Sequence, residues 1–115
     1  MSTLSTILAA VLGVVFIAVG LAKLTGRASV VANFERWGYA HAVLVATGTV
    51  ELLAGVLLLV GIVVTPLAIT GVLLVVFVMA GALLTHQHAH DPVGRRLPAV
   101  ALLALAFALT ASLLP

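Results

Sequence analysis

The chain has 115 residues, of which 64% are hydrophobic and only 7% are charged. A soluble domain carries about 25% charged residues, so this composition excludes an ordinary soluble fold and indicates an integral membrane protein. The five Lys and Arg residues form no basic stripe, which argues against nucleic acid as a partner. The absence of cysteine excludes disulfides, thiolate nucleophiles and cysteine-ligated metals. A redox role would therefore need a bound cofactor or a partner protein.

Four apolar runs are each long enough to cross a bilayer, which takes about 20 residues. The expected spans lie at about residues 4–24, 40–63, 67–85 and 98–114. A signal peptide would carry positive residues before its apolar run. None precedes the first run here, so we expect this run to be a retained helix. Together the runs predict one membrane domain, residues 1–115, with an all-α fold: a four-transmembrane-helix bundle of antiparallel up-and-down hairpins.

Turn signals separate these runs. Gly61 and Pro66 bracket a very short turn, so the second and third spans are expected to form a tight antiparallel hairpin. Polar connections at residues 25–39 and 86–97 join the other spans. Pro98 suits the first turn of the last span, because its missing N–H is not needed there.

The basic residues predict the orientation in the membrane. All five Lys and Arg residues lie in or beside the two polar connections, which four spans place on the same side of the membrane. The positive-inside rule then puts both polar connections in the cytoplasm and both termini outside, in a multi-pass protein of the cell membrane. Trp37 and Tyr39 fit the aromatic belt at the cytoplasmic interface.

Glu51 is the only charged residue in its apolar run, and it lies roughly 15 Å below the cytoplasmic end of its helix, near the bilayer midplane. Such residues are costly and usually functional. Gly48 and Gly55 share its helix face, and small residues line close helix contacts, so we expect Glu51 to face the bundle. The third span offers no counter-charge at that depth. We therefore expect Glu51 to be protonated or to lie in a water-filled cavity; the alternative is a structural hydrogen bond to backbone or to Thr47.

Lys23 and His86 are the other polar residues at the ends of spans. Lys23 closes the first span, with an axial gap of roughly 10–12 Å to Glu51. It meets Glu51 only if it points inward, and we expect it instead to snorkel to the headgroups. His86 ends the third span, where an imidazole that faces the bundle can join a proton path. The three residues converge from three helices toward the cytoplasmic half.

A histidine-rich segment follows the third span. In an extended chain its three alternating imidazoles would share one side, whereas in a helix His86 and His90 would share a face. Either geometry offers ligands to zinc or copper. The candidate metal ligands are His86, His88, His90 and Asp91. Because the spacing matches no fixed metal motif, we expect a solvated loop rather than a metal centre.

Four short motifs stand along the spans and their connections: GLAKL at residues 20–24, Phe34 with the WGY that ends at Tyr39, VELLAG at 50–55 and MAGALLTH at 79–86. Their joint order, over nearly the whole chain, resembles the DoxX-like family of small four-helix membrane proteins. That family takes its name from a subunit of a thiosulfate:quinone oxidoreductase, and some members are linked to redox partners. The resemblance implies that Lys23, Glu51 and His86 are recurring polar positions, without establishing thiosulfate oxidation here.

The function expected from these features is that of a redox-associated membrane subunit. An apolar pocket with a few inward polar groups suits a quinone or a similar lipophilic molecule. Lys23, Glu51 and His86 are the candidate catalytic residues, and the candidate ligand contacts are Trp37, His41 and Thr85. Whether the protein is an enzyme stays open from the sequence.

Two other functions remain. A proton-coupled transporter of the small-multidrug-resistance type also relies on a membrane glutamate, and a scaffold would use Glu51 and Lys23 only as a packing pair. The expected partners are the lipid bilayer, a redox protein and, because glycines line the helix faces, a second copy of the chain in a homo-oligomer.

Overall fold

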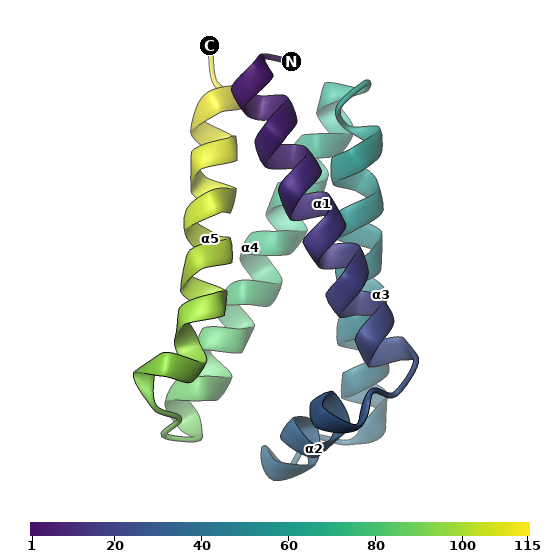
Figure 1. Ribbon diagram of the computed structural model, residues 1–115, viewed down its shortest axis with the longest axis vertical. Helices are drawn as coiled ribbons and strands as arrows, with labels where there is room; N and C mark the ends of the chain where they lie inside the picture. The colour runs from purple at the N-terminus through teal and green to yellow at the C-terminus, as the bar shows by residue number, and fades with distance from the viewer.

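The computed structural model describes all 115 residues and contains five helices and no strands (Figure 1). The helices are α1 (Thr3–Leu24), α2 (Ala28–Arg36), α3 (His41–Val60), α4 (Thr65–His88) and α5 (Val93–Leu113). All except α2 are long and apolar enough to cross a membrane. The predicted all-α bundle of four membrane helices is therefore confirmed.

The four long helices pack in a closed order. Helix α1 contacts α3 and α5, and α4 contacts the same two helices from the other side. Both chain termini lie at one end of the bundle, whereas α2 and the α4–α5 turn lie at the opposite end (Figure 1). The helix axes spread apart toward the α2 end. The candidate functional site lies at this end of the bundle.

Helices α1, α3 and α4 begin and end within three residues of the expected spans, whereas α5 begins before the expected fourth span. Helix α5 begins at Val93 after the N-cap residue Pro92, five residues before the expected position. Pro98 therefore lies inside the helix rather than in its first turn. Its missing N–H would have bonded the carbonyl of Gly94, which lies in the exposed first turn. The helix can continue through Pro98 because that carbonyl remains accessible to water.

The first polar connection contains a helix that the sequence analysis missed. Val30, Val31 and Phe34 recur at helical spacing in α2, and Phe34 is buried. The ring of Phe34 packs against the rings of Trp37 and Tyr39, with centroids 5.2 and 5.9 Å away. Burial of Phe34 within this aromatic cluster helps to hold α2 against the end of the bundle.

Helices α1, α2 and α4 end in the same type of turn, at the α2 end of the bundle. Gly26, Gly38 and His90 have positive φ angles of 71°, 80° and 56°. After each, the next amide donates to a carbonyl five residues earlier, as in the Schellman motif: Arg27 to Ala22, Tyr39 to Phe34 and Asp91 to His86. The left-handed conformation is easy for glycine but uncommon for histidine. The last of these turns folds Asp91 back against His86.

Glycines bring the backbones of α1 and α3 into direct contact. A Cβ atom on Gly20 would lie 2.7 Å from the amide nitrogen of Leu52 and 2.8 Å from the carbonyl oxygen of Gly48. A Cβ on Gly55 would lie 2.7 Å from the carbonyl oxygen of Gly13. The predicted glycine faces are thus confirmed as packing faces. Because they are used within one chain, these glycines give no support for the predicted homo-oligomer.

We expect Gly20→Ala to destabilise the protein by about 1–3 kcal/mol, the usual cost of overpacking a close contact. The added methyl group would meet backbone atoms of α3, which cannot move aside as a flexible side chain would. The midpoint of SDS-induced or thermal unfolding in a mild detergent measures this loss.

Gly81→Ala is the matched control, because a Cβ on Gly81 would have no atom within 4 Å. Alanine also has the higher helix propensity, so this variant should be as stable as the wild type or slightly more stable. Equal losses of stability in the two variants would show that the α1–α3 contact is not as close as described.

Candidate functional site

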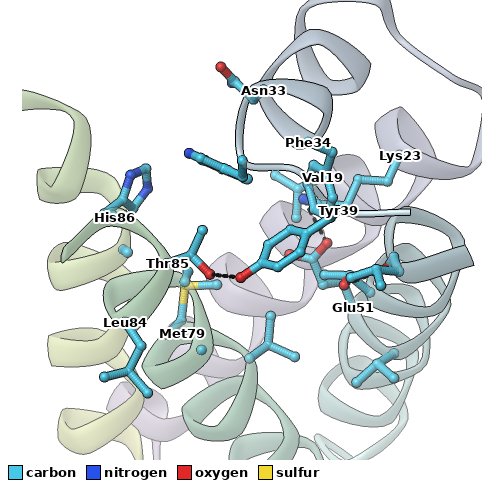
Figure 2. Close-up of a pocket in the computed structure, with 18 of the residues that line it drawn as sticks. Val19, Lys23, Asn33, Phe34, Tyr39, Glu51, Met79, Leu84, Thr85 and His86 are labelled. Atoms are coloured by element: carbon cyan, nitrogen blue, oxygen red, sulfur yellow. Dashed lines mark hydrogen bonds and ion pairs between the residues drawn. The ribbon is translucent and has the colours of Figure 1, made fainter. Parts of the chain in front are cut away.

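A cavity of about 730 Å³ lies between the diverging ends of the helices, on the α2 side of the bundle (Figure 2). All five helices contribute to its wall, and most of the lining residues are hydrophobic. Polar side chains reach it from every helix: Lys23, Asn33, Glu51, Thr85, His86 and Arg95 are among them. The cavity is therefore an apolar space with a few polar groups, the usual character of a small-molecule site.

Lys23 and Glu51 form an ion pair in the wall of this cavity. Lys23 Nζ lies 2.7 Å from Glu51 Oε1, and both side chains are largely buried, at 15% and 3% exposed. The contact exists because Gly48 lets α1 approach: a Cβ on Gly48 would lie 2.8 Å from the Cβ of Lys23. The expectation that Lys23 snorkels to the headgroups is therefore wrong. So is the expectation that Glu51 has no counter-charge.

The carboxylate of Glu51 is paired by charge with Lys23. The contact is short, although its angles fall outside ordinary hydrogen-bond geometry. Charge attraction does not need that alignment, and we therefore describe the contact as an ion pair. The hydroxyl of Thr47 donates to the carbonyl of Val43 at 2.7 Å instead, so the alternative hydrogen bond to Thr47 does not form. Lys23 is therefore the partner that the structure gives to this buried carboxylate.

Tyr39 crosses the cavity toward α4. Its hydroxyl shares a hydrogen bond of 2.7 Å with the hydroxyl of Thr85 (Figure 2). Thr85 was predicted as a ligand contact, and it lines the cavity. Tyr39 was assigned to the interfacial aromatic belt, yet it lines the cavity as well. The pair joins the α2–α3 connection to α4 on the side of the cavity that faces Glu51.

Asp91 is the centre of a polar cluster at the α2 end of the cavity. Its carboxylate accepts hydrogen bonds of 2.7 and 3.2 Å from the guanidinium of Arg36 and one of 3.2 Å from Trp37 Nε1. His86 Nδ1 lies 2.7 Å from the same carboxylate. Arg36 and Trp37 stand at the end of α2, whereas His86 belongs to α4. We call these four residues the latch, because they tie α2 to the α4–α5 turn.

The latch fixes the charge of Asp91. Hydrogen bonds from Arg36 and then His86 hold the pKa of the Asp91 carboxyl well below its usual range, against the opposing effect of burial, and Trp37 adds to the same shift. The carboxylate in turn raises the pKa of the Arg36 guanidinium by accepting its hydrogen bonds. Since the folded pKa of Asp91 is below its ordinary value of 3.8, its stabilising effect is complete above that pH. It is lost only as the pH falls through the lowered pKa.

The predicted catalytic residues Lys23, Glu51 and His86 all line the cavity, and so does Trp37. Lys23 and Glu51 contact each other. However, His86 contacts Asp91 and the edge of the Trp37 ring, at a centroid distance of 5.3 Å, rather than the ion pair. His41, predicted as a ligand contact, begins α3 as an exposed residue and does not line the cavity.

The histidine-rich segment adopts neither of the two expected geometries. His86 and His88 lie on the last turn of α4, so the segment is not extended. His90 lies beyond the helix with a positive φ angle, so it does not share a helix face with His86. His88 and His90 are exposed. No group of three or more His, Asp or Glu side chains is placed to hold a metal ion.

Sequence reasoning missed the roles of Arg36 and Arg95, and it considered Asp91 only as a metal ligand. Asp91 is the only acidic residue in the second polar connection, and Arg36 is adjacent to the only tryptophan. These facts could have indicated an ion pair between Arg36 and Asp91, which belong to the two polar connections. The distance between them in the sequence hid the contact.

We expect Asp91→Asn to loosen the latch, because the amide removes the negative charge that faces Arg36 and His86. Trp37 is the only tryptophan and donates to Asp91, so its fluorescence reports on the latch directly. The emission of the variant should shift to longer wavelength and become easier to quench with acrylamide.

Glu35→Gln is the control for charge alone, because Glu35 is an exposed acid in α2, next to Arg36 of the latch. It should leave the fluorescence unchanged. In the wild type, the emission should stay constant down to about pH 4 and shift only in stronger acid, as the lowered pKa of Asp91 requires. Unchanged fluorescence in Asp91→Asn would show that Asp91 does not hold Trp37 in place.

Comparison with known proteins places this architecture in one family. No curated protein and no solved structure matches the chain significantly. The family model described as the DoxX-like family matches residues 7–109, which include all of α2, α3 and α4 and most of α1 and α5. Most of the chain thus follows one family pattern, and the protein belongs to the DoxX-like family.

Proposed function

We propose that this protein is a redox-associated membrane subunit that binds a quinone or a similar lipophilic molecule in the 730 Å³ cavity. The observation that carries the proposal is the Lys23–Glu51 ion pair, buried in the wall of an apolar cavity. Intramembrane ionisable residues of this kind commonly mark binding sites or proton paths.

The distribution of polar groups supports a quinone ring. Its apolar face would contact the hydrophobic lining, while its two carbonyl oxygens accept hydrogen bonds. Lys23 offers a donor on the α1 side of the cavity, and the Tyr39–Thr85 pair offers hydroxyl groups toward α4. Polar groups at separated points of an apolar cavity are what such a ligand needs.

Proton exchange is the chemistry that the chain's own residues would provide. Reduction of a quinone to a quinol consumes two electrons and two protons. Lys23 and Glu51 can transfer protons at the cavity wall. The electrons would come from a redox partner protein, which is the proposed partner of this subunit.

A cation transporter is less well supported by the geometry. A membrane glutamate binds a cationic substrate when its negative charge is free. Here Lys23 already neutralises Glu51 at 2.7 Å. A site of this kind favours a neutral molecule.

We also propose that the α2 end of the bundle faces the cytoplasm. Arg27, Arg36, Arg95 and Arg96 all lie at this end, between α1 and α2, in α2 and in the first turn of α5, as the positive-inside rule requires. The short α3–α4 turn at the other end carries no charged residue.

Single cysteines test this orientation, because the chain has none of its own. Val63→Cys lies in the α3–α4 turn at a position 87% exposed, and His88→Cys lies at the exposed end of α4. In intact cells, a membrane-impermeant maleimide should label only the Val63→Cys variant. The opposite pattern would reverse the proposed orientation.

Titration with a short-chain benzoquinone tests the ligand. We expect Lys23→Met to weaken binding at least tenfold, because it removes a charged donor and a hydrogen bond to a charged group contributes about 1.5–3 kcal/mol. Glu51→Gln should weaken binding in the same direction, because it removes the charge that holds Lys23 at the cavity wall. The measurement is the equilibrium binding curve of the purified protein in a neutral detergent.

Glu35→Gln is again the matched control, because it removes an exposed acid that does not line the cavity. Its affinity should equal that of the wild type. A wild type that binds no quinone would contradict the proposed function. Loss of stability in Glu51→Gln without any ligand binding would favour the scaffold, and uptake of cations by vesicles under a pH gradient would favour the transporter.

A further inference from the structure

A second cavity, of about 480 Å³, lies beside the latch. In contrast to the larger cavity, its wall is mainly polar. The lining residues are Ser29, Asn33, Arg36, Trp37, His86 and Arg95. The quinone proposal makes no use of this pocket, and nothing in the sequence analysis anticipated it.

The pocket is rich in hydrogen-bond donors and has a positive charge. Two guanidinium groups line it and no carboxylate does. The nearby carboxylate of Asp91 is already occupied by Arg36, Trp37 and His86. It therefore does not neutralise Arg95.

Three of the lining residues have side chains without a partner in the protein. The guanidinium of Arg95 forms no ion pair with any of the three acidic residues. The hydroxyl of Ser29 and the side-chain amide of Asn33 form no hydrogen bond within the protein. Arg36 and Trp37, which line the same pocket, donate instead to Asp91. Unpaired donors around a positive pocket are suited to a phosphate group, which offers several acceptor oxygens.

We propose that this pocket binds the phosphate of an anionic phospholipid. The pocket lies where the membrane spans end, which is the depth of the headgroups. An anionic lipid presents its phosphate at this depth, beside the basic residues where the spans end, so the position of the pocket favours a lipid over free phosphate.

The lipid would lie at the mouth of the larger cavity. Asn33, Trp37, His86 and Arg95 line both cavities. A bound headgroup would therefore contact the latch and cover the cytoplasmic end of the quinone site. The lipid site is defined by its own donors, so it does not rest on quinone binding.

Lipid binding to the purified full chain in a neutral detergent provides the test. Native mass spectrometry would compare phosphatidylglycerol, phosphatidylcholine and inorganic phosphate as separate probes. We expect phosphatidylglycerol to be retained preferentially, and Arg95→Gln to weaken it about fivefold, as expected for one basic residue near anionic lipid. Arg95→Lys, which keeps the charge, should lose less.

Arg27→Gln is the matched control, because Arg27 is an exposed arginine at the same end of the bundle that lines neither cavity. It should bind phosphatidylglycerol as the wild type does. Trp37 fluorescence confirms that each variant keeps the latch. Equal retention of the two lipids, or equal losses in Arg95→Gln and Arg27→Gln, would overturn the proposal. Inorganic phosphate that binds as tightly as the lipid and displaces it would overturn the lipid as the ligand.

Discussion

The direct contact between the backbones of α1 and α3 is the constraint on which the rest of the structure depends. Gly20 meets Gly48 and Leu52 without room for a side chain. This contact sets the register of the two helices and brings Lys23 next to Glu51. A buried carboxylate without a partner would be strongly unfavourable in a membrane. The glycines therefore determine whether Glu51 can be tolerated at this depth, as well as how closely the helices pack.

The two ends of the bundle are held together by different interactions. Near the termini the long helices pack closely, and the hydroxyl of Ser5 donates to that of Ser112 at 2.8 Å to join α1 and α5. At the α2 end the helices diverge, and the Asp91 latch and the Tyr39–Thr85 pair connect them. At this end, polar contacts at a few points connect the helices in place of continuous apolar packing. The helices can therefore stay apart, and the cavity lies between them.

The sequence predicts the spans well because hydropathy and length determine whether a segment can cross a bilayer. It also predicts that Glu51 faces the bundle, since glycines share its helix face. It does not predict the direction of Lys23, which depends on the distance between two backbones and not on the local sequence. The start of α5 was misplaced because Pro98 resembles a helix start, whereas Pro92 fills the N-cap position. The latch joins residues more than 50 positions apart, such as Arg36 and Asp91, and no local pattern reports such a contact.

The charges separate the site into two regions with different preferences. In the larger cavity, Lys23 and Glu51 cancel, so the wall at that depth has no net charge and suits a neutral ligand. At the mouth, the carboxylate of Asp91 pairs with Arg36, Arg96 donates to the backbone carbonyl of Asp91, and Arg95 has no acidic partner, so a positive charge remains. A cation would meet this positive charge before it reached Glu51, whereas an anionic headgroup would be attracted to it. The same arrangement thus disfavours cation transport and agrees with a neutral lipophilic molecule inside and an anionic lipid at the entrance.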